Sequence, residues 1–453
     1  MRLQNATAPG EHAFTRLGGV LLASLVVAHG GIGPSTAQTL NEALASAYVS
    51  NPTLRAAQAE LRRTDEQVPQ ALAGWRPQAD VTAGGGVAAS QGSQRALLSA
   101  SSGGVVALDL RVKQPIYNFE TPASIKQAEA AVKAQRARLT AVEQDVLTHA
   151  ATAYAEVLRA QNILELNTSH EQLVQRDLES VRRRFSTGEL SRSDLAQSEA
   201  SLAQAAALRT QSEADLASAR EVYRVWVGDL PGTLVEPGLP KGLPATEEEV
   251  AKQSSENPNV VAADYAVKVA SEGVDVSVGQ KLPQVFLQGD VGASGQSILG
   301  LLSVPIFNGT LDPQVRAAKQ LVGQRRLEAD AQRRTAQQAA IGAWQRFVAA
   351  QASIASYKAQ VAAAQAAADG VSREQAVGLR TVENMLSAQD RLLAAQVSLI
   401  GAQRDAFRTA IEVLASVSRL TARDLGLDVP YYDPERHYKE VRGKWWGTAA
   451  DEK

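Results

Sequence analysis

The sequence predicts a mixed α and β chain made of two similar halves, each with a helix, a pair of strands and a very long helical hairpin. Three observations support this fold class. An ordered series of motifs occurs in both halves, two long stretches with helical periodicity lack proline, and segments of alternating apolar residues precede each stretch. The 21% of charged and 5% of aromatic residues suit long helices packed along their length better than a compact core filled by rings.

The internal repeat is the most informative of these observations. The landmarks of the first half recur in the same order in the second, namely Asn51-Pro52 as Asn257-Pro258, Arg76-Pro77 as Leu282-Pro283, Gln114-Pro115-Ile116-Tyr117-Asn118 as Val304-Pro305-Ile306-Phe307-Asn308, and Gly188 as Gly378. The halves differ in length only between Pro77 and Pro115, where the first has a longer loop rich in Gly, Ser and Ala at residues 88–104. A single match could arise by chance, but this ordered series indicates an internal twofold repeat.

The N-terminal residues 1–37 resemble a secretory signal peptide. Arg2 and Arg16 form the charged region, a short apolar stretch follows at 17–28, and the small residues Ser35-Thr36-Ala37 permit cleavage after Ala37. An uncleaved interfacial anchor is the alternative. After Ala37, no window approaches the roughly 20 apolar residues that a membrane-spanning helix needs.

The same elements are expected in both repeats. Asn51 is a favourable helix N-cap, and Pro52 stands at the preferred first helical position. The predicted domains are a first repeat at 38–230, with strands at about 78–90 and 104–114 and a helical hairpin at 119–228; a second repeat at 231–430, with a helix at 247–281, strands at about 283–293 and 296–306 and a hairpin at 310–420; and a C-terminal tail at 431–453.

The long helices are predicted by the absence of proline and by a heptad pattern. No proline occurs from Ala123 to Leu230 or from Gln314 to Val429. Apolar residues recur every seventh position at Ile125, Val132, Leu139 and Val146. Gly188 and Gly378 then mark turns between antiparallel helices. A helix over 123–187 would be about 100 Å long. An extended coiled coil without a pore would share this pattern.

The strand segments separate a membrane barrel from a plain coiled coil. In the second strand segment, apolar residues alternate with mostly charged ones. The apolar residues are Val106, Leu108, Leu110 and Val112, and the residues between and after them are Ala107, Asp109, Arg111 and Lys113. Segments of this length suit tilted strands that cross a bilayer, although a soluble sheet with one wet face would alternate equally well. Four strands cannot close a barrel alone, and lipid forbids an open sheet edge. Several chains must therefore combine their strands, and three chains would supply an even total of about twelve.

Several function classes lack support in the sequence. The chain has no cysteine, its five histidines are scattered without metal-ligand spacing, and its net charge of −2 gives no basic surplus for nucleic acid. Nucleotide-binding, hydrolase and zinc-protease motifs are missing. We therefore expect no enzyme, no cofactor and no metal site.

The repeated landmarks together resemble the TolC family of outer-membrane ducts over about residues 38–429. The motifs that carry the resemblance are Ser50-Asn51-Pro52 and Glu256-Asn257-Pro258, the Pro77 and Pro283 positions before the strands, the 114–117 and 304–307 motifs after them, and the tips Phe185-Ser186-Thr187-Gly188-Glu189-Leu190 and Gln375-Ala376-Val377-Gly378-Leu379-Arg380. The resemblance implies a homotrimer with a twelve-stranded outer-membrane β-barrel, continued by an α-helical barrel through the periplasm. It implies a passive duct for type I secretion or multidrug efflux that works with a periplasmic adaptor (membrane fusion) protein and an inner-membrane pump, either an ABC transporter or a proton-driven exporter.

The resemblance also implies a periplasmic gate beyond the turns, held shut by polar links. The matching positions are Ser193, Asp194, Gln375, Arg380, Asn384 and Ser387. An Arg and an Asp on adjacent helices can form such a charge-assisted link, and ordinary solvated turn residues are the alternative. The family's well-studied members carry two aspartates where this sequence has Asn384 and Ser387, so an acidic constriction ring is in doubt here.

The two turns are the expected adaptor contacts, with Gly188, Glu189, Leu190, Gly378 and Leu379. An exposed leucine there could anchor a partner helix, or it could be an ordinary C-cap contact. The tail at 431–453 lacks periodicity and suggests a flexible periplasmic segment, whereas Trp445-Trp446 could instead dock it on the helices. A secreted structural coiled-coil protein without a pore is the alternative function for the whole chain.

Overall fold

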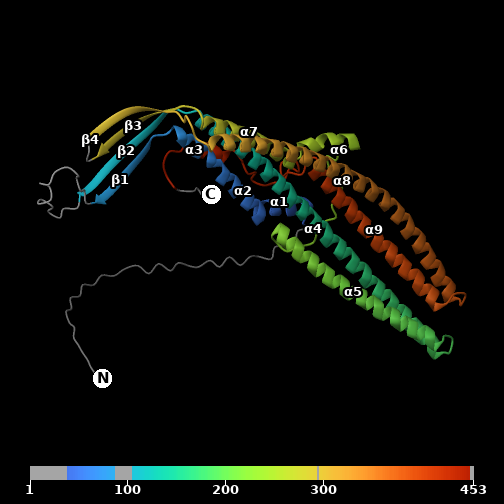
Figure 1. Ribbon diagram of the computed structural model, residues 1–453. Coiled ribbons are helices and arrows are strands. Elements are labelled where there is room, and N and C mark those ends of the chain that lie inside the picture. Colours follow the sequence, from blue (N-terminus) through green and yellow to red (C-terminus); the bar gives the residue numbers. More distant parts are fainter. Residues whose placement is uncertain (1–37, 87–104, 293–294, 449–453) are drawn as a thin grey trace, which may run out of the picture. The chain divides into compact units, whose positions relative to one another are not determined.

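The computed structural model describes residues 38–86, 105–292 and 295–448, which form a four-stranded sheet and two long helical hairpins (Figure 1). The expected signal peptide and the expected loop at 88–104 lie outside the described residues. Within the described part of the chain, no helix combines the length and the apolar character needed to cross a membrane.

Short helices begin the first repeat: α1 (Leu40–Ser50), α2 (Pro52–Asp65) and α3 (Gln67–Leu72), followed by a 3₁₀ turn at Ala73–Trp75. The expected cap at Asn51 is present, because its side chain accepts a hydrogen bond from the Thr53 backbone N–H at 2.9 Å. The helix that begins at Pro52 is interrupted after Asp65, and α3 resumes at Gln67. Pro69 explains the interruption, since its ring would clash with the carbonyl four residues earlier in a continuous helix.

The second repeat also divides a helix that the sequence predicts to be continuous over 247–281. Helix α6 (Glu247–Gln253) passes into a 3₁₀ turn (Ser254–Glu256), and α7 (Pro258–Gly279) begins afresh. Asn257 caps α7 through a hydrogen bond from the Asn259 backbone N–H at 3.0 Å. Pro258 occupies the first turn of α7, where its missing N–H does no harm.

The sheet contains β1 (Gln78–Gly86), β2 (Val105–Tyr117), β3 (Gln284–Gly292) and β4 (Gly295–Ser303), in that order and antiparallel throughout. Strand β2 extends beyond the predicted end at 114. It accommodates Pro115 where the register shifts between Pro115 and Tyr117, since proline lacks the N–H that a regular ladder needs. Strand β4 ends at Ser303, short of the predicted residue 306 and of Pro305.

Two hairpins form most of the helical part: α4 (Glu120–Ser186) with α5 (Arg192–Val227), and α8 (Leu311–Ala376) with α9 (Val382–Ser416). At 67 residues, α4 is about 100 Å long. The heptad residues Val132, Leu139 and Val146 of α4 are buried. Helix α4 contacts α5, α7 and α9, so it joins the two repeats. A short helix, α10 (Arg436–Val441), follows near the C-terminus.

The main core surrounds α4 where α1, α5 and α9 meet it. Tyr154 and Tyr223 are completely buried there. The Tyr154 hydroxyl accepts a hydrogen bond from the Val235 backbone N–H at 3.0 Å and lies 2.9 Å from the Gln38 carbonyl oxygen. These contacts fasten the linker between the repeats, around Val235, to the centre of the first hairpin.

Candidate functional site

The strand register sorts the sheet into two faces. Asp80 pairs with Arg111, which pairs with Asp290, and Asp290 pairs with Ser297, so a polar row crosses all four strands. Within it, Arg111 Nε donates to Asp290 Oδ1 at 2.8 Å. The adjacent row on the other face contains Val81, Leu110, Val291 and Gln296. The alternation predicted from the sequence thus extends across strands from both repeats.

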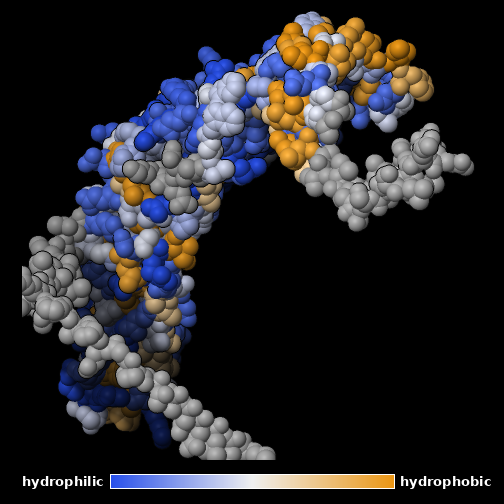
Figure 2. All heavy atoms as spheres, turned by 90° about the vertical axis from the view of Figure 1, so that its left-hand side faces the viewer, coloured by the Kyte–Doolittle hydropathy of each residue, from blue (hydrophilic) through white to orange (hydrophobic). Residues whose placement is uncertain are grey.

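The face opposite the polar row exposes large apolar side chains. Val81 is 69% exposed, Ile298 79% and Leu302 66%, and Leu108, Leu110 and Leu287 are also exposed. Figure 2 shows hydrophobic residues gathered at the end of the molecule that carries the strands. Among the described residues, β1 and β4 each pair along only one side, so the sheet has two open edges. The backbone groups of the open edges can be satisfied by pairing with further strands, and the apolar face is suited to contact with lipid.

The turns at the far ends of the hairpins adopt the same geometry. Gly188 and Gly378 have φ angles of 77° and 80°, in the left-handed region that favours glycine. Glu189 N–H donates to the Arg184 carbonyl at 2.9 Å, and Leu379 N–H donates to the Glu374 carbonyl at 2.9 Å. These bonds close the ends of α4 and α8 as glycine C-caps, as the sequence predicts.

The two leucines of these turns have different environments. Leu190 is half-buried and packs against a cluster of Val181, Val382, Met385 and Leu386, so it follows the C-cap alternative. Leu379 is 75% exposed, beside Val377 at 72%. An apolar surface for a partner is therefore present at the second turn and lacking at Leu190.

Each predicted gate residue of opposite charge finds its partner within its own turn. Asp194 Oδ2 accepts from the backbone N–H and hydroxyl of Ser191, at 3.0 and 2.6 Å, as an N-terminal capping box of α5. Arg380 Nε donates to Glu374 Oε2 at 2.8 Å. A single chain therefore does not join Asp194 to Arg380.

The remaining predicted gate positions lie close to the same turns. Gln375 is buried at the end of α8, whereas Ser193, Asn384 and Ser387 are exposed. The Asn384 backbone N–H donates to the Thr381 hydroxyl at the start of α9. The exposed side chains on α5 and α9 can face other copies of the chain.

A polar seam between α4 and α9 is not evident from the sequence. Gln389 Nε2 donates to Asp177 Oδ2 at 2.8 Å, and His170 Nε2 lies 3.7 Å from Asp390 Oδ1. Burial lowers the pKa of His170, while the nearby Asp390 and Asp177 carboxylates counteract this effect. Burial raises the pKa of Asp177, and its hydrogen bond from Gln389 opposes the rise. No local pattern could reveal these pairs, because the partners lie far apart in the chain.

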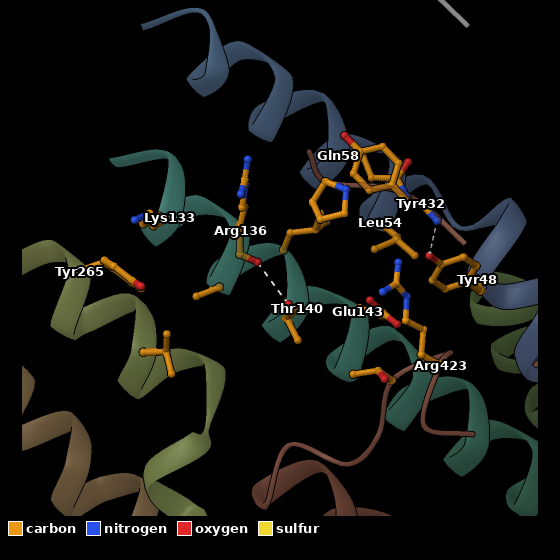
Figure 3. Close-up of a pocket in the computed structure, with 15 residues that line it drawn as sticks. Tyr48, Leu54, Gln58, Lys133, Arg136, Thr140, Glu143, Tyr265, Arg423 and Tyr432 are labelled. Atoms are coloured by element: carbon orange, nitrogen blue, oxygen red, sulfur yellow. Dashed lines mark hydrogen bonds between the residues drawn. The ribbon is translucent and has the colours of Figure 1, made fainter. Parts of the chain in front are cut away.

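The C-terminal segment is packed against the helices and lines one side of a cleft of about 520 Å³ (Figure 3). Tyr432 N–H donates to the Tyr48 hydroxyl at 3.1 Å, and Glu143 Oε1 accepts from the Ala422 N–H at 2.7 Å. Burial raises the pKa of Glu143, and the hydrogen bond from Ala422 opposes the rise. The segment 431–448 thus packs against the helices through Tyr432 and Tyr438, whereas Trp445 and Trp446, which the docking alternative placed on the helices, remain 56% and 85% exposed.

The described residues contain no group of His, Cys, Asp or Glu side chains arranged to hold a metal ion.

Comparison with known proteins places the chain in a family. It is 33% identical to the outer membrane efflux protein BepC of Brucella suis biovar 1 (strain 1330) over 425 residues, which cover 90% of this chain and 92% of BepC. The chain belongs to the outer membrane efflux protein family. The model of that family matches residues 43–224. Outer membrane protein TolC of Escherichia coli (strain K12) is 24% identical over 426 residues, covering 86% of this chain and 84% of TolC.

Solved structures of outer-membrane and channel proteins have the same fold. The outer membrane protein VceC from Vibrio cholerae matches with a TM-score of 0.73 at 20% identity, covering 84% of this chain and 96% of VceC. CusC matches with a TM-score of 0.72 at 16% identity, covering 83% of this chain and 91% of CusC. The predicted fold class and the resemblance to the TolC family are confirmed.

Membership of the efflux family also decides location and broad function. The chain is an outer-membrane channel protein with a large periplasmic helical part, and it is not an enzyme. The secreted structural coiled coil is therefore wrong as a description of this protein. The sheet with one apolar face is its membrane part, and the long hairpins are its periplasmic part.

Proposed function

We propose that three copies of this chain form the outer-membrane duct of a tripartite export system, for type I secretion or multidrug efflux. The duct passively conducts substrates from an inner-membrane pump to the outside. The observation that carries the proposal is the two-faced sheet with open edges. Four strands per chain supply about twelve in a trimer, an even number within the range of outer-membrane barrels. The polar row around Arg111 and Asp290 then lines the lumen.

The helical hairpins continue this duct toward the pump in the proposed assembly. A periplasmic adaptor protein contacts the two turns, at Gly188 and Glu189 in the first and at Gly378 and Leu379 in the second, while Leu190 packs inside its own chain. Leu379 and Val377 offer the apolar side chains for that contact. The pump, an ABC transporter or a proton-driven exporter, supplies the energy.

Electron microscopy of the mature protein, purified from outer membranes in detergent, tests the proposal. We expect hollow threefold particles over about 100 Å long, with one end inside the micelle. Channel conductance in planar bilayers is the matching functional measurement. Solid rods without a micelle, or particles without threefold symmetry, would overturn the trimeric duct.

The gate proposal is that Asp194 and Arg380 approach each other between neighbouring copies, although each has a partner in its own turn. Because the chain has no cysteine, introduced cysteines give an unambiguous disulfide test. We expect the double variant Asp194→Cys with Arg380→Cys to form an intermolecular disulfide that lowers conductance until a reductant is added. The single variants are the controls. Absence of the cross-link in the intact trimer would remove this pair from the gate.

A further inference from the structure

The C-terminal segment follows α4 from the centre of the helical part toward the sheet. Ala422 contacts Glu143, Glu435 forms an ion pair with Arg136 at 3.3 Å, and Arg442 forms one with Glu129 at 3.1 Å. As the tail runs toward its C-terminal end, it contacts α4 residues of decreasing number, so it runs antiparallel to α4. Because α4 begins at Glu120, directly after β2, the tail approaches the base of the strands (Figure 1).

A buried carboxylate helps to hold this course. Asp65 at the end of α2 has a completely buried side chain, and His437 Nδ1 of α10 lies 3.3 Å from its Oδ2. Val441, also in α10, is buried against the helices. Polar and apolar contacts together fix the direction of the segment before its last described residues.

Two tryptophans of the tail lie at the membrane end of the helices. The Arg76 guanidinium lies over the Trp445 ring, 4.9 Å from its centroid, and Arg76 is only two residues before Gln78, where β1 begins. Trp445 is 56% exposed and Trp446 is 85% exposed. Trp445 is thus held beside the start of the sheet, and its neighbour Trp446 is largely uncovered.

Other aromatic side chains lie at the same end of the sheet. Tyr117, the last residue of β2, packs edge-on against Phe119 at 4.7 Å, and Phe307 follows β4 and is 93% exposed. Tyrosine and tryptophan favour the head-group level of a bilayer, because their rings are partly apolar and carry a polar group. The tryptophan pair therefore continues an aromatic level that already belongs to the membrane part of the chain.

We propose that Trp445 and Trp446 insert into the head-group region of the leaflet that faces the periplasm, and so anchor the C-terminal segment to the outer membrane. The partner is the phospholipid bilayer surface. Both indoles are exposed, Trp445 lies beside Arg76 just before β1, and the chain is an outer-membrane protein. The anchor does not depend on the export system or on the gate.

Quenching of tryptophan fluorescence by lipid tests the anchor. The full-length mature protein is reconstituted into vesicles of phosphatidylcholine that carries bromine on its acyl chains near the head group. The variant Trp75→Phe serves as the background, because Trp75 also lies at the base of the sheet. Trp226, stacked on His149 at 4.2 Å, and Trp344, beside Phe347, lie in the helical part and are internal references.

We expect brominated lipid to quench part of the emission in the Trp75→Phe background, and we expect this quenching to be lost when Trp445→Phe and Trp446→Phe are added. Unchanged quenching after these changes would overturn the proposal. Emission from the pair that is quenched by aqueous iodide and not by lipid would also overturn it, because the pair would then face water. Emission quenched by neither reagent would overturn it as well, because the pair would then be covered by a neighbouring copy.

Conductance of the same variants separates this inference from the proposed duct. We expect unaltered single-channel conductance, because the pair lies outside the lumen in our proposal. A lowered conductance would place the tryptophans along the passage and overturn the anchor while leaving the duct intact.

Discussion

At the scale of single residues, backbone conformation explains why glycine stands at each hairpin turn. Gly188 and Gly378 have positive φ angles, and a Cβ at either position would meet no neighbouring atom. The demand for glycine is therefore conformational and not steric toward other residues. A non-glycine residue in this region is disfavoured by roughly 1–2 kcal/mol.

We predict that Gly188→Ala and Gly378→Ala each destabilise the protein by about 1 kcal/mol or somewhat more. Gly401 in the middle of α9 also has open space around it, but its backbone is helical. The control Gly401→Ala should stabilise by about 0.5–1 kcal/mol, because alanine is the better helix former. Guanidinium unfolding of the purified protein in detergent measures both effects, and equal signs for the turn and helix variants would contradict the argument.

The side chains of Asn384 and Ser387 bear on the cation selectivity of the channel. Both are exposed on α9, and neither is acidic. We predict weak cation selectivity and weak block by multivalent cations, because no carboxylate ring is formed at these positions. The double variant Asn384→Asp with Ser387→Asp should raise both, since three copies would add six negative charges within one helical turn of each other.

Single-channel recordings of reversal potential and cation block measure this outcome. Strong block in the unaltered protein would contradict it. In that case the variant Asp194→Asn shows whether Asp194 provides the charge instead, because block that survives this change must arise elsewhere.

At the scale of elements, the seam between α4 and α9 holds the two hairpins of one chain together. An apolar cluster around Val382 and Met385 lies nearest the turns, and the pairs of Asp177 with Gln389 and of His170 with Asp390 follow farther along. Glu156 and Arg404, at 3.3 Å, continue the seam toward the main core. Separation of the hairpins would therefore have to break polar contacts in which at least one partner, such as His170, is largely buried.

The titration of His170 makes this seam sensitive to pH. Burial lowers the pKa of His170 below its ordinary value of 6.5, so the unfolded or separated state binds the proton more readily. The stability from neutral His170 is present above pH 6.5 and is lost as the pH falls through the lowered pKa. The pKa of Asp177 is raised, so its effect on stability has the opposite pH dependence. Its contribution to folding stability is present below pH 3.8 and is lost as the pH rises through the raised pKa.

We predict that acidification below pH 6.5 increases hydrogen exchange in α9 opposite His170, and that His170→Gln reduces this increase. His149→Gln on the same helix is the control, because the His149 ring is about half exposed and lies away from the seam. An acid response that persists in His170→Gln, or disappears in His149→Gln, would assign the effect to another group.

At the scale of the whole molecule, the two faces of the sheet must meet different surroundings in the assembled channel. Leu110 lies between Val81 and Val291 on the apolar face, whereas Thr82 lies opposite Asp109 on the polar face. A charge on a lipid-facing position near the bilayer midplane costs roughly 2–4 kcal/mol. The polar face should tolerate the same charge, because water fills the lumen.

We therefore predict that Leu110→Lys sharply reduces the amount of protein assembled in the outer membrane, while Thr82→Lys leaves it nearly unchanged. Quantitative immunoblotting of outer-membrane fractions measures the amounts. The two variants place the same side chain at nearly the same level of neighbouring strands but on opposite faces. Equal losses for both variants would mean that the lumen and lipid faces have been wrongly assigned.

The sequence by itself determined those features that depend on local chemistry or on periodicity. The glycine turns, the Asn-Pro helix starts, the proline-free long helices and the strand faces all appear in the structure as predicted. Each follows from the conformations that one residue permits, or from the spacing that places side chains on one face. The duplicated order of these features was enough to indicate the family.

Only the tertiary structure decided which distant residues meet. It buried Leu190 while leaving Leu379 exposed, gave Asp194 and Arg380 partners in their own turns, and packed the tail on α2 and α4. Helical periodicity states which face of a helix is buried, but not which helix covers it or at what level. The His170 seam and the course of the C-terminal tryptophans depend on that choice of neighbour and level, which packing in three dimensions decides.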